Sequence, residues 1–438
     1  MTTTSTRRSG FAVVAICFAT ILADGYDLVL YGATLTKIKA TPGWEVSNQM
    51  AGLIGSLTLF GLMIGFMVAG PLSDRFGRRK VLITGVTWFS LASMVCALSV
   101  SPEMLGATRF ITGIGLGAVV PSAVAMTVEY APLKRRQLYT GLMITGYSVG
   151  GIIAALAAMA ALQDLGWRFL FGIAGAFVLI VPVMYFRLPE SAVYLYSRGR
   201  IDQARMLAHR YGVILDEADT STDPGRTTQA CETGGYRKLL SKRYIAAITL
   251  FTIVCFLGNV AVYGLGTWLP EIMHESGYDL GSSISFLLTL QIGAITGMLT
   301  GSSWADRFGP GRVILLYLAV GAVSLMVMSQ KLPYGWLMVA VIGAGIGTTA
   351  AMMLTYGFIA AYFPSNCRAS AVGMAMGIGR TGSILGPMLA AMIMGSTLGH
   401  AWSFYVFAIA LGLAAASVAV LNARPRRSGH VEEQLVVA

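Results

Sequence analysis

Long apolar stretches, separated by short polar segments, run through almost the whole chain. Each of twelve stretches is long enough to form a helix that crosses a bilayer, which takes about 20 mostly apolar residues. These stretches are 11–36, 50–72, 81–100, 103–127, 138–162, 168–187, 244–269, 281–304, 311–329, 334–360, 369–395 and 401–421. The pattern predicts an all-α membrane protein with twelve transmembrane helices.

The two halves of this pattern repeat one another. Asp74-Arg75-Phe76-Gly77 recurs as Asp306-Arg307-Phe308-Gly309, and Tyr31-Gly32 recurs as Tyr263-Gly264, in both cases 232 residues later. We therefore expect two pseudo-symmetric six-helix halves, a type of repeat that places a substrate site between the halves near the bilayer midplane.

The repeat divides the chain into three parts. Residues 1–187 form the first six-helix half, and residues 244–438 form the second half with a short tail. The polar segment 188–243 is a linker, in which IDQARMLAHRYG predicts a short amphipathic helix.

Composition and charge agree with a membrane protein. The chain is 55% hydrophobic and 12% charged, whereas soluble domains carry about 25% charged residues. If the N-terminus is cytoplasmic, nearly all Lys and Arg lie in the cytoplasm. The exceptions are Lys37, Lys39, Arg168 and Lys331 outside, and Arg109 and Arg380 within spans. This asymmetry predicts that both termini are cytoplasmic in a multi-pass protein of the cell membrane. It also explains the net charge of +11 without a nucleic-acid partner.

The first span contains two acids, Asp24 and Asp27. A carboxylate at bilayer depth costs about 3 kcal/mol on insertion scales, and residues three apart share one face of a helix. A carboxyl group in a low-dielectric setting takes up a proton more readily than in water. The pair is therefore a candidate for proton coupling, and a structural pair held by interhelical hydrogen bonds is the alternative.

The repeat shows that the scaffold does not require these ionisable groups. The corresponding positions in the other half are Phe256 for Asp24, Asn259 for Asp27 and Ser148 for Arg380. Arg380 is a candidate to bind a substrate carboxylate, because guanidinium binds carboxylate bidentately. Pairing with an aspartate in the empty state, or with helix-end carbonyls, is the alternative.

Arg109 in the fourth span can act in transport or form an ion pair with Glu129. Glu129 ends that span. It can carry protons or close a cytoplasmic gate with Arg135 or Arg136, and we favour the gate.

Several motifs resemble those of a known family. GPLSDRFGRRK at 70–80 is similar to the signature loop between helices 2 and 3 of the major facilitator superfamily, and GSSWADRFGPGR at 301–312 is its degenerate copy. LPESAVYLYSRGR after the sixth span resembles the linker of solute importers in that superfamily. DGYDLVLYG in the first span and GIGRTGSILGP at 377–387 resemble the aromatic acid:proton symporter family.

This resemblance implies a proton-coupled importer of an aromatic carboxylate of the benzoate, hydroxybenzoate, protocatechuate or gentisate type, as used in aromatic hydrocarbon catabolism. It implies a monomer that uses the proton gradient and no cofactor. It also implies that both aspartates matter for transport and links Arg109 to proton transfer. The loop charges would switch the conformation by bridging helix ends across the boundary between the halves. The loop residues are Asp74, Arg75, Gly77, Arg78, Arg79, Asp306 and Arg307.

Aromatic and amide side chains complete the candidate site. Tyr31 and Tyr147 are the best candidates to pack on a substrate ring, ahead of Tyr26, Tyr263, Tyr356 and Trp268. Asn259 and Gln291 can hydrogen-bond a ring hydroxyl. The alternatives are packing for the aromatic residues and interhelical hydrogen bonds for the amides.

Other functions remain as alternatives. A proton symporter of a non-aromatic acid, such as shikimate or a dicarboxylate, shares much of the pattern. A proton-driven exporter is disfavoured because GLMITGYSVGG has Tyr147 where exporters carry proline. An intramembrane aspartyl protease would place its acids on two helices. We find no sequence motif for a metal site or for catalysis, and we expect no enzyme activity.

Overall fold

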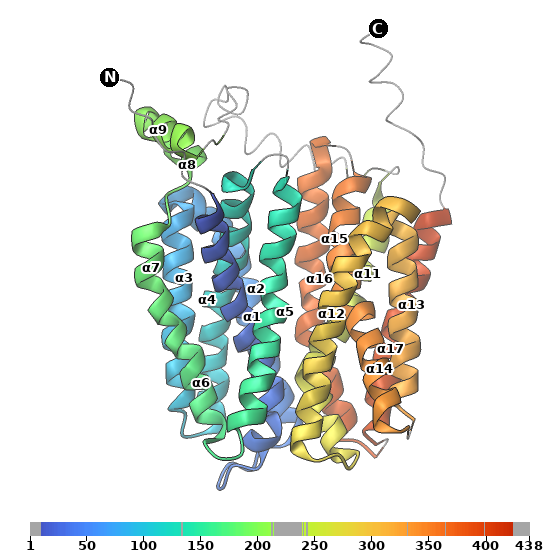
Figure 1. Ribbon diagram of the computed structural model, residues 1–438. Coiled ribbons are helices and arrows are strands. Elements are labelled where there is room, and N and C mark those ends of the chain that lie inside the picture. The colour runs from blue at the N-terminus through green and yellow to red at the C-terminus, as the bar shows by residue number, and fades with distance from the viewer. Residues whose placement is uncertain are drawn as a thin grey trace.

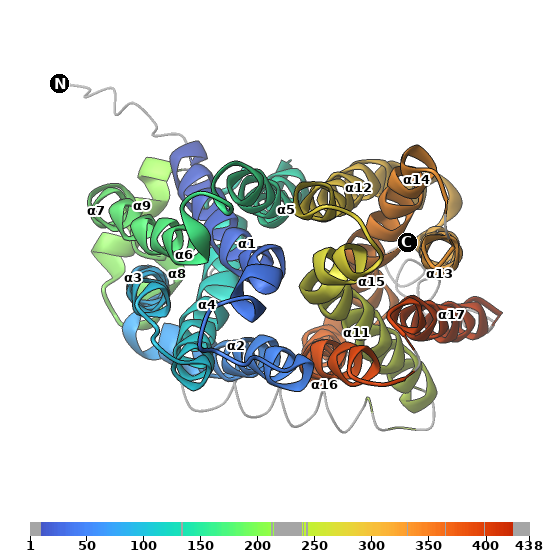
Figure 2. The ribbon, with the colours of Figure 1, turned by 90° about the horizontal axis from the view of Figure 1, so that it is seen from below.

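The structure, a computed structural model, describes residues 10–132, 135–211, 213, 239, 241, 244–330, 332–363, 365–397 and 399–423. The elements assigned in these residues are helices, which form two bundles side by side (Figures 1 and 2). The first bundle consists of α1 (Phe11–Lys39), α2 (Asn48–Phe76), α3 (Arg78–Ala97), α4 (Pro102–Tyr130), α5 (Arg136–Ala161), α6 (Gly166–Ala176), a 3-10 turn (Phe177–Leu179) and α7 (Ile180–Arg187).

The second bundle also has six helical segments among the described residues, but its fourth segment is interrupted instead of its sixth. It consists of α11 (Ile245–Glu275), α12 (Leu280–Phe308), α13 (Pro310–Met328), α14 (Tyr334–Gly345), a π segment (Ile346–Ala350), α15 (Ala351–Tyr362), α16 (Ser365–Met394) and α17 (Ala401–Ala423). Two short linker helices, α8 (Ala192–Ser197) and α9 (Ile201–Tyr211), lie at the end of the bundles where α1 begins (Figure 1). The amphipathic helix expected in the linker thus corresponds to α9.

Eleven helical segments among the described residues are long and apolar enough to cross a membrane, with α6–α7 and α14–α15 each counted as one segment. The remaining predicted span, 369–395, corresponds to α16, which is 30 residues long. The all-α fold with helices at the predicted spans is therefore confirmed.

The helix ends follow the sequence repeat. α2 and α12 are both 29 residues long, and each ends at a glycine with positive φ, 97° at Gly77 and 88° at Gly309. Residues with a Cβ rarely adopt this conformation, so the same turn is built at the same place in both halves. At the other end of α12, Asp279 accepts hydrogen bonds from the backbone N–H and the hydroxyl of Ser282, and these bonds lower the pKa of the Asp279 carboxyl.

In the described part of the chain, the main contacts between the two halves join α1 with α11, α2 with α16, and α5 with α12. They surround the middle of the molecule when the bundles are seen along their length (Figure 2). Residues of α1, α5, α11, α12 and α16 therefore reach the boundary between the halves.

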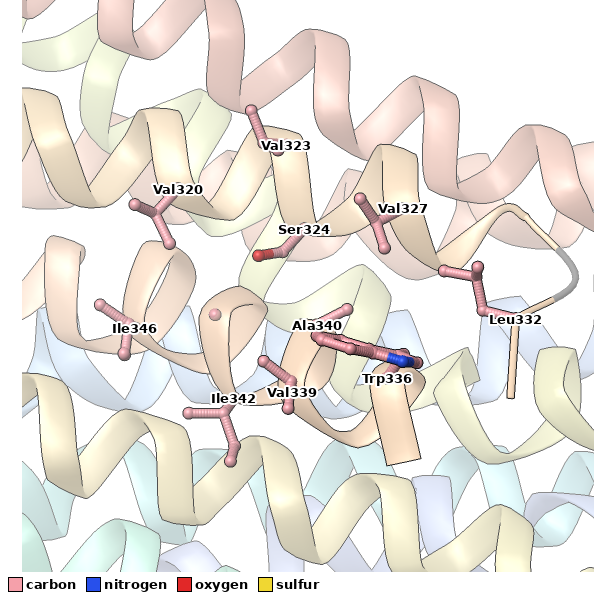
Figure 3. Close-up of a pocket in the computed structure, with 11 residues that line it drawn as sticks. Val320, Val323, Ser324, Val327, Leu332, Trp336, Val339, Ala340, Ile342 and Ile346 are labelled. Carbon is pink, nitrogen blue, oxygen red and sulfur yellow. The ribbon is translucent and has the colours of Figure 1, made fainter. Parts of the chain in front are cut away.

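A groove of about 610 Å³ lies instead on the outside of the second half, between α13 and α14 (Figure 3). Its lining is almost wholly apolar, with Ser324 as a polar member and Val323 60% exposed. No charged side chain lines this groove, so it offers no partner for an anionic substrate. Its outward, apolar lining suits the lipid side of a membrane protein.

Candidate functional site

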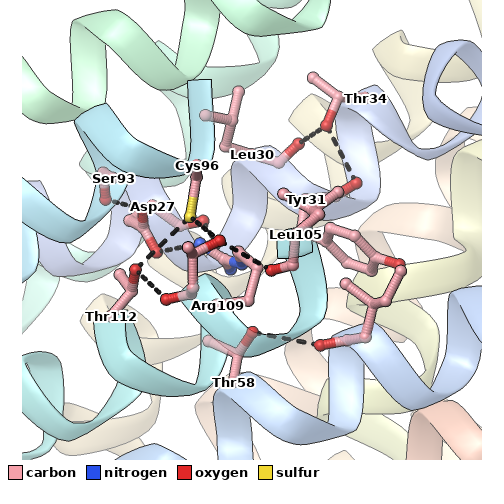
Figure 4. Close-up of polar contacts among 12 residues, drawn as sticks. Asp27, Leu30, Tyr31, Thr34, Thr58, Ser93, Cys96, Leu105, Arg109 and Thr112 are labelled. Atoms are coloured by element: carbon pink, nitrogen blue, oxygen red, sulfur yellow. Dashed lines mark hydrogen bonds and ion pairs between the residues drawn. The ribbon is translucent and has the colours of Figure 1, made fainter. Parts of the chain in front are cut away.

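Asp27 on α1 and Arg109 on α4 form a buried ion pair. Arg109 Nη1 donates to Asp27 Oδ2 at 2.5 Å, and Ser93 Oγ on α3 donates to the other carboxylate oxygen at 2.9 Å (Figure 4). Asp27 is 0% and Arg109 is 1% exposed. Both charges are thus compensated away from water, and removal of one partner would leave the other unpaired.

The surroundings of this pair hold it in place. Arg109 lies 5.7 Å from the ring centre of Tyr31 and 5.4 Å from that of Phe171. The Tyr31 hydroxyl donates to the Ala51 carbonyl at 2.6 Å. The structure therefore places Tyr31 beside Arg109, with its hydroxyl already occupied. Arg109 pairs with Asp27 and not with Glu129.

Close contact between α4 and α2 positions Arg109. A Cβ on Gly113 would lie 2.1 Å from the Thr58 carbonyl oxygen, and a Cβ on Gly117 would lie 2.2 Å from that of Leu62. Glycines at these positions let the two backbones touch. The glycines that follow Arg109 thus fix the position of α4 along α2, and with it the position of the Arg109 guanidinium.

Asp24 lies about one helical turn before Asp27 but in a different environment. It is 2% exposed, and its Oδ1 has no hydrogen-bond partner among the residues that the structure describes. Its carboxyl interacts electrostatically with Arg380 first and with Asp27 to a smaller extent. The structure therefore separates the two acids: Asp27 is held within the first half, whereas Asp24 faces the cation of the second half.

Arg380 on α16 lies in a cluster of tyrosines. Its Nη1 is 3.5 Å from the Tyr263 hydroxyl, and it interacts electrostatically with Tyr356, Asp24 and Tyr147. The Arg380 Nε is buried without a partner in the described part of the chain. A guanidinium with a donor to spare, beside phenol groups from both halves, is chemically suited to a carboxylate ligand.

The amides predicted for the site differ in their roles. Asn259 Nδ2 donates to the Gly379 carbonyl at 3.1 Å. Asn259 thus positions the residues around Arg380. Gln291 on α12 is 4% exposed, and its Nε2 has no partner among the described residues.

Glu129 belongs to a separate network at the end of the molecule that carries α8. It accepts hydrogen bonds from Arg78 Nη1 at 3.0 Å, from Ser191 Oγ at 2.6 Å and from the Ala192 N–H at 2.5 Å. The favoured partners Arg135 and Arg136 form no ion pair with it in the described structure. Glu129 thus anchors the start of the linker to the signature loop.

The signature loop is bound to the linker and to α7. The Arg79 N–H donates to Glu190 Oε1 at 3.0 Å, and Arg198 Nη2 donates to the carbonyls of Asp74 at 3.0 Å and Arg75 at 2.9 Å. These contacts differ from the expected bridge across the two halves. In the second copy of the loop, beside Asp306, Arg307 packs over the Phe308 ring at 5.4 Å.

Sequence reasoning missed an ionic contact at the opposite end. Lys39 at the end of α1 forms a salt bridge with Glu271 on α11, and Thr36 donates to Glu271 at 2.5 Å. Glu275 is a second acid for Lys39 at 3.6 Å. The sequence repeat could have indicated this contact, because Lys39 and Glu271 are 232 residues apart and therefore occupy equivalent positions in the two halves.

Comparison with known proteins gives a consistent result. The sequence model of the Major Facilitator Superfamily matches residues 9–302 and 280–435. A gentisate transporter from Corynebacterium glutamicum is 34% identical over 94% of this chain and 87% of its own length. A benzoate transport protein from Acinetobacter baylyi is 30% identical over 94% of this chain and 89% of its own.

The fold also has close structural counterparts. The xylose transporter XylE from E. coli, in a partially occluded inward-open conformation, superposes with a TM-score of 0.77 at 16% identity, over 96% of this chain and 99% of that chain. Sequence motifs, helix order and superposition agree over nearly the full length. The chain is a multi-pass membrane transporter that belongs to the Major Facilitator Superfamily.

Proposed function

We propose that the protein imports an aromatic carboxylate together with a proton across the cell membrane, with both termini in the cytoplasm. The observation that carries this proposal is Arg380, which lies between the halves among tyrosines and keeps a buried donor without a partner among the described residues. The names of the gentisate and benzoate relatives support the substrate class.

The site residues suggest a division of labour. Arg380 binds the substrate carboxylate, and the rings of Tyr147, Tyr263 and Tyr356 pack around the substrate. Asp24 competes with the substrate for Arg380, because its carboxylate interacts with the same guanidinium. A proton on Asp24 removes this competition, so proton uptake and anion binding favour one another.

The Asp27–Arg109 pair is the second ionic element on the proton route. Weakening of the bond between Asp27 and Arg109 would free the contact between α1 and α4. No cofactor is needed, because the driving force is the proton gradient. Import of an anion against a negative interior costs about 2.3 kcal/mol per 100 mV, and one co-transported proton removes this cost.

Uptake of labelled benzoate, 4-hydroxybenzoate, protocatechuate and gentisate into cells tests the proposal. We expect at least one acid to accumulate, a protonophore to abolish accumulation, and Arg380→Gln to abolish uptake. Arg205→Gln, which removes an exposed arginine on the linker helix α9, is the matched control and should transport normally. Normal uptake by Arg380→Gln, or no uptake of any of the acids by protein present in the membrane, would refute the proposal.

A further inference from the structure

Gln291 is a buried amide that the scaffold does not require. Its side chain is 4% exposed, and its Nε2 has no hydrogen-bond partner among the described residues. At the corresponding position of the first half, 232 residues earlier, the chain has Leu59, which is also 4% exposed. An apolar residue thus fills the same place in the repeated fold. Since an unsatisfied buried amide is unfavourable, a ligand is a reason for its presence.

The amide lies on the boundary between the halves. A Cβ on Gly151 of α5 would come within 2.4 Å of Gln291 Nε2 and within 2.9 Å of Val29 Cγ2 of α1. The amide nitrogen therefore rests against α5 where that helix carries no side chain. This arrangement places a hydrogen-bond donor of the second half against the surface of the first.

The same face of α5 leads to Arg380. Tyr147 lies four residues before Gly151, which corresponds to about 6 Å along the helix, and interacts electrostatically with Arg380. This rise along α5 between Tyr147 and Gly151 is similar to the distance across an aromatic ring, from a carboxylate to a substituent on the far side. Arg380 and Gln291 thus both lie near this stretch of α5, Arg380 through Tyr147 and Gln291 at Gly151, so a ring whose carboxylate is bound by Arg380 can extend its far edge toward Gln291.

A second unpartnered polar group lies on this part of α5. Ser148, three residues before Gly151, is 0% exposed, and its Oγ has no partner in the described structure. Ser148 is also the repeat counterpart of Arg380. Ser148 Oγ of the first half and Gln291 Nε2 of the second half are thus both buried without a partner among the described residues. Both lie within about one helical turn of α5.

We propose that Gln291 determines specificity by donating a hydrogen bond to a hydroxyl group on the far side of the substrate ring. The inference rests on the proposed function and adds to it. The preferred substrates would carry a hydroxyl at ring position 3 or 4, numbered from the carbon bearing the carboxylate. A hydroxyl at position 2 would lie beside the carboxylate, near Arg380, and would gain nothing from Gln291.

Binding to the purified full-length protein, measured by calorimetry, tests this inference without a variant. We expect 3-hydroxybenzoate or 4-hydroxybenzoate to bind at least about tenfold more tightly than benzoate, as one buried hydrogen bond allows. The isomer 2-hydroxybenzoate should bind like benzoate. Equal affinities for all four acids would overturn the assignment.

The variant Gln291→Leu introduces leucine, the residue found at the equivalent position 59 of the first half. The ratio of the affinity for the hydroxylated acid to the affinity for benzoate should fall to about one. The affinity for benzoate itself should stay the same or rise. Gln163→Leu makes the same chemical change on an exposed loop and should preserve the ratio. A purely structural role for Gln291 would weaken binding of every acid equally, which would overturn the inference.

These outcomes separate the inference from the proposed function. If none of the acids binds or is taken up, the proposed function fails, and the role of Gln291 fails with it. If aromatic acids bind and are transported but the ratio is unchanged in Gln291→Leu, only the role of Gln291 is refuted.

Discussion

At the scale of single residues, the structure gives different tasks to two acids on one helix. Asp27 receives hydrogen bonds from Arg109 and Ser93, whereas Asp24 Oδ1 has no partner in the described part of the chain. Asp27 therefore contributes to folding as well as transport. Asp24 is available to a proton and to Arg380.

Stability measurements should distinguish the two acids. Asp27→Asn leaves the Arg109 charge uncompensated, and loss of one partner of a buried pair costs about 3–5 kcal/mol. Asp24→Asn breaks no ion pair in the described structure, so its loss of stability should be smaller than that of Asp27→Asn. Thermal unfolding in detergent measures both. Asp27→Asn combined with Arg109→Gln should recover part of the loss, and equal effects of the two single variants would contradict this division.

Transport measurements on Asp24→Asn should separate proton coupling from substrate binding. Asp24→Asn carries no proton on this side chain, so accumulation driven by a pH gradient should be lost. Exchange of labelled for unlabelled substrate should persist, because Arg380 remains. Proteoliposomes allow both measurements, and pH-driven accumulation at the normal rate by Asp24→Asn would exclude a coupling role for this acid.

The sequence was sufficient to select these residues but not to pair them. A charge inside an apolar stretch is unusual, so Asp24, Asp27, Arg109 and Arg380 could be identified without a structure. Pairing depends on the depth and rotation of each helix. Arg109 could have met Glu129 by sequence alone, and only the packing of α4 against α1 brings it to Asp27.

At the scale of helices, small residues decide how closely elements approach. The twelve spans follow directly from the apolar pattern, because membrane thickness fixes helix length. The π segment Ile346–Ala350 could not be predicted in this way, since it continues the apolar stretch. Glycines mark close contacts only where a neighbouring backbone is present, and the sequence does not show which glycines have one.

Two glycine substitutions should have opposite effects on stability. At Gly117 a Cβ would lie 2.2 Å from the Leu62 carbonyl oxygen, whereas at Gly141 no atom lies within 4 Å. Gly117→Ala should therefore destabilise by about 1–3 kcal/mol through overpacking. Gly141→Ala should be neutral or stabilising, because alanine favours helix. Thermal unfolding of the two variants provides the comparison, and equal stability would mean that α4 does not depend on this contact.

At the scale of the whole molecule, the repeat predicts which helices meet but not which side chains touch. Two residues related by a pseudo-two-fold axis can contact each other only if both lie close to that axis. Lys39 and Glu271 are 232 residues apart, and they form a salt bridge. The axis must therefore pass near this pair, at the end of the molecule away from the linker. Identical charged residues at these equivalent positions would repel each other, whereas Lys39 and Glu271 have opposite charges and attract.

This pair should hold the two halves together at that end. Glu271 is 4% exposed and accepts hydrogen bonds from both Lys39 and Thr36 of the other half. Glu271→Gln should weaken these charge-assisted bonds and raise the rate of amide hydrogen exchange at the adjoining ends of α1 and α11 by about tenfold. The exchanged variant, Lys39→Glu with Glu271→Lys, should restore protection, whereas Lys37→Gln should leave protection unchanged because Lys37 forms no ion pair in the described structure. If the amides of Glu271→Gln exchange at the wild-type rate, the ionic pair does not hold the two halves together at this end.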